Sequence, residues 1–246
     1  MRAGAINPGM ALEAFTASPT SPALKITGSL YASGLDSVEV ERALEHLDQR
    51  VFGDIALPGI GFLASPLGLV RGDGLHDFID RYAKRHAIED FPIRFAAVAT
   101  ALESGEPVIF NAGDVGLAVK ASSAIPGLIA PARIGGRLYS DCQVSNPLPV
   151  RAARRLGAQR VIAVDVVYPP RDAGLTSSVR VMFQALNIAT FRLKEWEAAG
   201  ADLIIAPELP KTSGQFGFSD RGMLTEAGAR ATERMLPQIR TLFDRR

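Results

Sequence analysis

Residues 138–150 read Leu-Tyr-Ser-Asp-Cys-Gln-Val-Ser-Asn-Pro-Leu-Pro-Val, and this stretch decides the fold class of the chain. It places one carboxylate, Asp141, at the end of a short predicted strand and ahead of a turn punctuated by prolines. An Ala- and Arg-rich predicted helix follows, and a β-branched predicted strand comes after it. Such a succession is typical of α/β enzymes, which keep functional groups in the loops that follow strands.

Predicted helices and strands alternate outward from this stretch, from about residue 36 onward. Nearly continuous apolar character indicates buried strands at Arg94–Ala101, Pro107–Asn111, Arg160–Val167 and Asp202–Pro207. Apolar residues at helical spacing, with Asp36 and Ser37 as caps for the first helix, predict helices over Val38–Arg50, Leu75–His86, Ser177–Ala199 and Thr225–Phe243. The alternation predicts an α/β fold with a mainly parallel sheet covered by helices.

Composition favours a single globular domain and excludes several classes of partner. Of the 246 residues, 47% are hydrophobic, and 27 Lys and Arg residues nearly balance 26 Asp and Glu residues. This balance gives no basic surface for nucleic acid, so no nucleic-acid partner is expected. One Cys excludes an internal disulfide framework. Because the sequence shows neither a signal peptide nor a run of about 18 apolar residues, we expect a cytoplasmic protein, with membrane association left open.

Five segments, in their order and spacing, are similar to the patatin-like phospholipase family, and especially to its bacterial members. They are Ile26–Gly34, Gly68–Gly72, Ala99–Pro107, Val119–Leu128 and the segment around Asp141. The resemblance implies a three-layer α/β/α patatin-like sandwich. It also implies a single, N-terminally incomplete domain over residues 26–246. Residues 1–25 are Pro-, Ser- and Thr-rich in part and are expected to be irregular.

The resemblance further implies a serine acyl-ester hydrolase that uses a Ser/Asp dyad, needs no cofactor and acts on a phospholipid or lysophospholipid. Asp141 corresponds to the family's catalytic carboxylate. The family usually has Gly after this Asp, whereas Cys142 and Gln143 follow it here. Judged without the family, Asp141 is either a base for a nucleophile or a turn residue that bonds its own backbone.

The family's Gly-x-Ser-x-Gly elbow is not recognisable in this chain. Its spacing falls on Thr20-Ser21-Pro22-Ala23-Leu24, which puts Pro22 in the nucleophile position and Ser21 one residue early. Ser21 is therefore the candidate nucleophile. Two accounts fit: a hydrolase with a truncated or altered start, or a natural non-catalytic relative that binds lipid or serves as a scaffold. Both predict little hydrolysis by this chain.

Other candidate chemistry is weaker. The three histidines, His46, His76 and His86, precede Asp141 and lack His-x-x-x-His spacing, so we expect surface histidines, no Ser-Asp-His triad and no metal site. A carboxylate neighbour disfavours the thiolate of Cys142, which argues against a Cys nucleophile. The stretch Asn111–Gly116 follows a predicted strand like a phosphate loop, but Asp114 would repel phosphate and suits an N-cap for a helix over Val115–Ser122.

Apolar loops extend the lipid hypothesis. The segment Ile55–Val70 is apolar and punctuated by Gly and Pro, so it fits either an acyl-chain lid or a buried connector. Phe216, Phe218 and Met223 mark a second apolar loop. A membrane surface is therefore expected as a transient partner.

Overall fold

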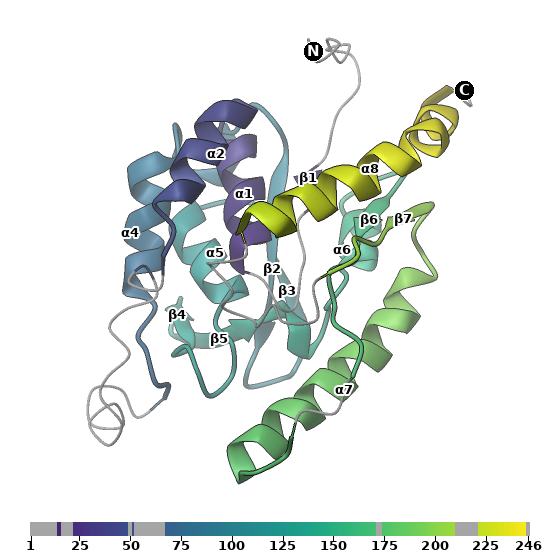
Figure 1. Cartoon of the computed structure of the whole chain (residues 1–246). Helices are drawn as coiled ribbons and strands as arrows, with labels where there is room; N and C mark the ends of the chain where they lie inside the picture. Colours follow the sequence, from purple (N-terminus) through teal and green to yellow (C-terminus); the bar gives the residue numbers. More distant parts are fainter. Residues whose placement is uncertain are drawn as a thin grey trace.

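The computed structural model describes residues 14–15, 22–48, 51, 67–170, 174–209 and 221–244. Within these residues, helices surround one five-stranded sheet and one two-stranded sheet (Figure 1). The predicted α/β class is confirmed. None of the described helices is long and apolar enough to cross a membrane.

Strand β2 (Phe95–Ala101) is the centre of the larger sheet, and all seven of its residues are buried. Strand β3 (Pro107–Phe110) pairs with it antiparallel, and so does β5 (Arg137–Asp141). The sheet continues from β5 to an antiparallel β4 (Ala132–Ile134). Strand β1 (Ala14–Phe15) adds a short parallel pairing with the start of β2. The smaller sheet pairs β6 and β7 in parallel, over Ile162–Val164 and Leu203–Ile205.

The prediction of a mainly parallel sheet is wrong for the described residues. Parallel neighbours need a crossover of a dozen or more residues, whereas β2 and β3 are joined by only the short segment 102–106. Between β4 and β5, Gly135 and Gly136 have φ of 57° and 83° and form the tight turn of a hairpin. Short apolar runs predicted β2 and β3, but an apolar run carries no information on the direction in which two strands pair.

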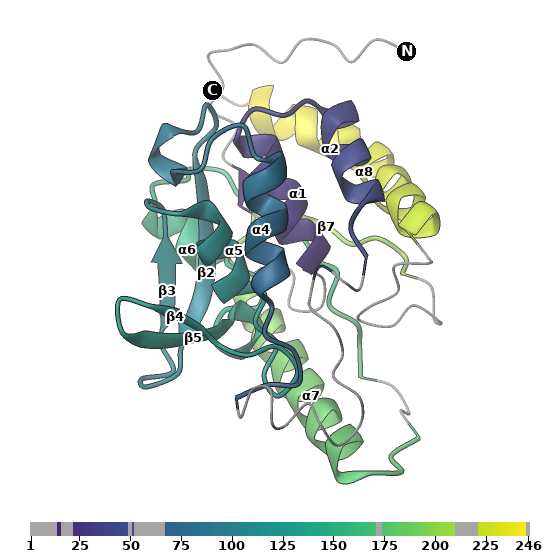
Figure 2. The same cartoon turned by 90° about the vertical axis from the view of Figure 1, so that its left-hand side faces the viewer.

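Helices α1 (Pro22–Ala32), α4 (Asp73–Tyr82) and α5 (Val115–Ser122) lie on one side of the larger sheet (Figure 2). Their apolar side chains fill the main core, which includes Ile26, Leu30, Leu75, Ile79, Val119 and Ile125. Helix α2 (Ser37–Glu45) begins behind Asp36, whose carboxylate accepts from the backbone of Val38 and Glu39. Of the two predicted caps, Asp36 is confirmed, because its oxygen satisfies donors that have no partner within the helix, whereas Ser37 is the first residue of the helix itself.

The expectation of irregular structure through residue 25 is wrong at two places. Helix α1 already begins at Pro22, and Ala14–Phe15 form strand β1. Pro22 suits the first turn of a helix, because its fixed φ matches and no partner is required for its missing N–H. Residues 22–25 therefore join the folded body and reach the end of β5.

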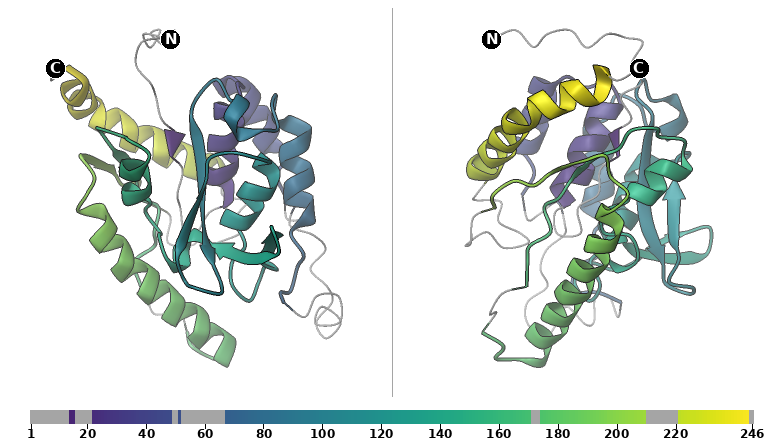
Figure 3. Two further views of the ribbon diagram at one scale, coloured as in Figure 1. Left: turned by 180° about the vertical axis from the view of Figure 1, so that it is seen from behind. Right: turned by 90° about the vertical axis from the view of Figure 1, so that its right-hand side faces the viewer.

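The C-terminal part contributes α6 (Val150–Arg155), α7 (Ser178–Ala198) and α8 (Arg221–Asp244). The helices predicted over Ser177–Ala199 and Thr225–Phe243 are confirmed within a few residues. Figure 3 shows α7 extending away from the sheet, while α8 runs across the end of the molecule near α2. Two 3-10 turns, η2 (Ile88–Asp90) and η3 (Cys142–Val144), complete the described elements.

Candidate active site at the end of strand β5

Asp141, the carboxylate singled out by the sequence, is the last residue of β5, and its backbone is fixed from several sides. It lies opposite Ala99 in the β2–β5 ladder. Its N–H donates to the Ala124 carbonyl at 2.9 Å, and its own carbonyl accepts from Thr100 Oγ1 at 2.8 Å. The residue is only 1% exposed. The position of the Asp141 side chain is therefore set by the sheet and by the turn that follows α5.

The partner of this carboxylate is Lys25, from the first turn of α1. Lys25 Nζ lies 2.8 Å from Asp141 Oδ2, and it also donates to the Ser122 carbonyl at the end of α5. The other carboxyl oxygen, Asp141 Oδ1, accepts from the Gln143 N–H at 2.9 Å. Both carboxyl oxygens are thus engaged, and both members of the ion pair are buried.

Sequence reasoning did not single out Lys25. A signal was nevertheless present, because a lone Lys interrupts the run Ala23-Leu24-Lys25-Ile26 at the start of a helix. A Lys is almost never fully buried unless it is paired, so its place on the inner face of α1 required an acidic partner. Only the tertiary structure shows that this partner is Asp141.

Burial shapes the protonation of the two adjacent groups. Desolvation raises the pKa of the Asp141 carboxyl above its usual range, against the opposing effect of the Lys25 charge and hydrogen bond. Burial likewise raises the pKa of the Cys142 thiol to about 12, although the Lys25 charge partly offsets this. A thiol with that pKa is not a nucleophile near neutral pH, so the reading of Cys142 as a non-reactive residue is supported.

The nucleophile position coincides with the start of α1. Pro22, which occupies that position in the family spacing, is the first residue of the helix and carries no hydroxyl. Ser21 lies outside the described residues. Ser29 and Ser33 are buried and donate their hydroxyls to the Ile26 and Leu30 carbonyls of their own helix. The two described serines of the α1 region are therefore hydrogen-bonded to backbone rather than directed at Asp141.

The loop after Asp141 is held by α7. Gln143 is buried in η3, and its carbonyl accepts from Thr190 Oγ1 at 3.3 Å. Farther along α7, the buried Glu197 lies 3.4 Å from Arg151 Nε, and desolvation raises the pKa of its carboxyl. The long helix thus supports the loop that carries the predicted motif residues Cys142 and Gln143. The apolar segment predicted as a lid falls outside the described residues over 55–66.

His76 and His86 belong to a second polar cluster, at the N-terminal end of α5. His46 and His86 are exposed, as predicted for surface residues, but His76 is only 28% exposed at its side chain. Its Nε2 lies 3.3 Å from Asp114 Oδ1, and its Nδ1 lies 3.5 Å from Asp80 Oδ2. Asp114 also caps α5 by accepting from the Leu117 N–H, so its predicted capping role is confirmed.

Comparisons with known proteins find similar sequences over a large part of the chain. Residues 26–154, just over half of the chain, match the family model for patatin-like phospholipases. An uncharacterised NTE family protein of Mycobacterium tuberculosis (strain ATCC 25618 / H37Rv) is 35% identical over 153 residues, covering 60% of this chain and 41% of that relative. A second from the same strain is 26% identical over 240 residues, covering 86% and 40%.

A third relative is named for an enzymatic activity. The lysophospholipase NTE1 of Debaryomyces hansenii is 34% identical over 79 residues, covering 32% of this chain and 5% of its own length. The chain spans about two fifths of the length of the two mycobacterial relatives. The match over residues 26–154, which includes α1 from Ile26 onward, β2, α5 and Asp141, shows that this chain belongs to the patatin-like phospholipase family.

Proposed function

We propose that this chain carries the acyl-ester hydrolase scaffold of its family, built for a phospholipid or lysophospholipid ester, with Asp141 as the carboxylate of the Ser/Asp dyad. The proposal is supported by the contact between Asp141 and the first turn of α1. The carboxylate contacts Lys25, which lies one helical turn after the nucleophile position at residue 22. A hydroxyl at the start of α1 would therefore be within reach of this base.

In such a dyad, the Ser Oγ attacks the ester carbonyl carbon while the carboxylate takes the hydroxyl proton. The alcohol then leaves with that proton, and water hydrolyses the acyl-enzyme with the same carboxylate as base. The N-terminus of α1 would stabilise the oxyanion through its free N–H groups. The proposed scaffold is the three-layer patatin sandwich, with η3 and α7 as supports for the base.

Lys25 argues against rapid turnover by the described site. Burial raises the pKa of this carboxyl, but Lys25 Nζ and the Gln143 N–H already occupy both of its oxygens. A Ser hydroxyl would therefore have to displace a buried ion pair or hydrogen bond before it could transfer its proton. Pro22 offers no nucleophile. We therefore expect slow or undetectable ester hydrolysis unless Ser21, outside the described residues, rebuilds the elbow.

A second candidate function is lipid binding without catalysis. The Lys25–Asp141 ion pair favours it, because the pair occupies the carboxylate that a reaction would need. A non-catalytic relative that binds lipid would keep the fold without the dyad. Half-exposed apolar side chains on α7, such as Val179 and Met182, could then contact a membrane surface. Sedimentation with phosphatidylcholine vesicles tests this function, and Met182→Gln should lower the bound fraction if α7 is the contact.

Fluorophosphonate labelling with peptide mapping tests the hydrolase proposal. We compare the native chain with Asp141→Asn and with a restored elbow that combines Thr20→Gly, Pro22→Ser, Leu24→Gly and Lys25→Ala. The restored variant should be labelled at position 22, and adding Asp141→Asn should abolish the labelling. Labelling that does not depend on Asp141, in a variant with native circular dichroism, would remove Asp141 from the proposed role. Labelling of the native chain at Ser21 would show instead that the chain is an active hydrolase.

A further inference from the structure

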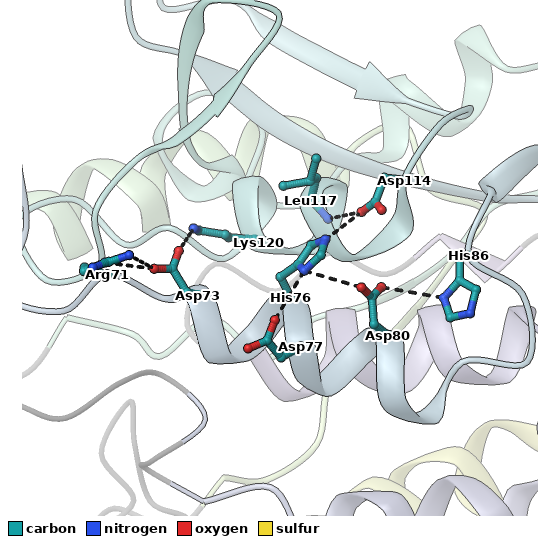
Figure 4. A network of polar contacts seen from close by, with 9 residues as sticks. All are labelled: Arg71, Asp73, His76, Asp77, Asp80, His86, Asp114, Leu117 and Lys120. Atoms are coloured by element: carbon teal, nitrogen blue, oxygen red, sulfur yellow. Dashed lines mark hydrogen bonds and ion pairs between the residues drawn. The ribbon is translucent and has the colours of Figure 1, made fainter.

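The cluster around His76 has a charge arrangement that its own side chains do not balance. Figure 4 shows the His76 ring between Asp114 and Asp80, with Asp77 beside it and His86 on the far side of Asp80. Carboxylate oxygens of Asp77, Asp80 and Asp114 lie 3.6, 3.5 and 3.3 Å from the ring nitrogens of His76. A single imidazole is thus enclosed by acidic groups on both of its nitrogens.

Neutral imidazole does not fit this arrangement. It has one N–H donor and one lone pair, so only one of its nitrogens can donate to a carboxylate. The other lone pair would then face a carboxylate oxygen, because Nε2 faces Asp114 while Nδ1 faces Asp80 and Asp77. A metal ion bound to one ring nitrogen, with the N–H on the other, would remove this repulsion.

Asp80 supplies an independent reason for a cation. Its Oδ1 is inaccessible to solvent and has no hydrogen-bond partner among the described residues. The nearest cationic candidate is His86, whose Nδ1 lies 3.6 Å away, beyond hydrogen-bond distance. A buried carboxylate oxygen without a donor is costly, and coordination of a metal ion would satisfy it.

The three donors are brought together by backbone contacts. His76 and Asp80 lie one turn apart on α4, and Asp114 is the N-cap of α5. The segment of His86 pairs with the α5 N-terminus, because Val115 N–H donates to the His86 carbonyl and Ile88 N–H donates to the Gly113 carbonyl, each at 2.9 Å. Gly116 makes room for His76, since a Cβ at residue 116 would lie 2.8 Å from the His76 ring.

We propose that His76, Asp80 and Asp114 bind a divalent transition-metal ion of the Zn²⁺ type, which ties α4 to the N-terminus of α5. One donor atom from each residue lies within 4.8 Å of the other two. Donors around a tetrahedral Zn²⁺ are about 3.4 Å apart, and the ion binds one ring nitrogen of a His. Rotation of the His76 ring and of the carboxylate that faces its other nitrogen would complete the set and leave a fourth position for water. The site is separate from Asp141, and it stands whether or not the proposed function does.

Zinc binding to the untagged full chain tests the proposal. The protein is treated with EDTA, dialysed, and titrated with ZnCl₂ by calorimetry, and Co²⁺ provides a visible spectrum that reports the donor geometry. We expect one equivalent to bind, and His76→Gln or Asp80→Asn to weaken binding at least about tenfold. His46→Gln is the matched control, because His46 lies outside the cluster and its Nδ1 lies 2.9 Å from the Arg42 carbonyl. It should leave the affinity within about twofold.

Two results would overturn the proposal. One is the absence of stoichiometric Zn²⁺ binding by the native chain, and the other is equal affinity of the native chain and a folded His76→Gln variant. In either case the cluster is a set of partly exposed carboxylates around a histidine, and it holds no metal ion.

Discussion

The two ends of α5 hold the same kind of contact, a nitrogen base against a carboxylate, in two different environments. At the C-terminal end, Lys25 and Asp141 have side chains that are 2% and 1% exposed, beside the Ser122 carbonyl. At the N-terminal end, His76 and Asp114 are 28% and 38% exposed. The buried contact excludes water, whereas solvent reaches both side chains of the exposed contact.

Both clusters agree with the helix dipole. The carboxylate of Asp114 lies at the positive N-terminus of α5, and the ammonium group of Lys25 lies at the negative C-terminus. The sign of each charge therefore follows from the helix, while burial decides how strongly the fold depends on it. This difference leads to four tests, ordered by the size of the expected effect.

Removing Lys25 should have the largest effect on stability. Lys25→Met leaves the Asp141 carboxylate buried without its ion-pair partner, so the free energy of unfolding should fall by about 3–5 kcal/mol. Urea denaturation of both proteins measures the difference. The double variant Lys25→Met with Asp141→Leu should be more stable than Lys25→Met alone, because it buries no unpaired charge. A single-variant loss below about 1 kcal/mol would mean that the pair behaves like an exposed one.

The Cys142 thiol should report the same burial through its reactivity. With a pKa of about 12, only about one thiol in ten thousand is ionised at pH 8. Native protein should therefore react with Ellman's reagent far more slowly than protein in denaturant, where the same Cys is solvated. Rapid stoichiometric reaction of folded protein would contradict the buried geometry around Asp141.

Gly116→Ala should test the packing at the exposed end of α5. The new Cβ would meet the His76 ring at 2.8 Å, so we expect a loss of about 1 kcal/mol in the free energy of unfolding, in spite of the better helix propensity of Ala. Gly228→Ala in α8 is the matched control, since its Cβ would have no neighbour within 4 Å. The control should be neutral or slightly stabilising. Equal effects of the two changes would show that His76 does not need the space at residue 116.

Asp73 at the start of α4 should give the smallest effect, and one that depends on pH. Its hydrogen bond to Lys120, at 2.6 Å, lowers the pKa of the Asp73 carboxyl below 3.8 (Figure 4). A lowered folded-state pKa contributes stability above the unfolded-state pKa, and this contribution is lost as the pH falls through the folded-state value. The group is half-exposed, so the contribution should stay below about 1 kcal/mol.

Urea denaturation of the native chain and Asp73→Asn between pH 6 and pH 3 checks this prediction. The stability difference between them should shrink as the pH falls, and 1 M NaCl should shrink it at pH 6 as well. If the stability difference between the two proteins grows as the pH falls, the pKa of Asp73 is raised in the folded protein, and the prediction is wrong.

Particular residues show how far the sequence could be read. Asp36 and Asp114 were predicted as caps and are caps, because a cap is a local hydrogen bond between a side chain and the next turn. The strand direction was not predictable from apolar runs, since it depends on which strands pair. Lys25 was missed for the same kind of reason, because its partner Asp141 is 116 residues away in the chain.

The sequence by itself determined the family, the α/β class, most helices and strands, and Asp141 at the end of its strand. These properties depend on local patterns and on motif spacing, which can be recognised without knowledge of the tertiary contacts. The tertiary structure alone decided the antiparallel sheet, the burial of Lys25 against Asp141, and the meeting of His76, Asp80 and Asp114. Each of these results from long-range packing, which brings residues from separate elements within a few ångströms of one another and sets the dielectric environment in which their charges interact.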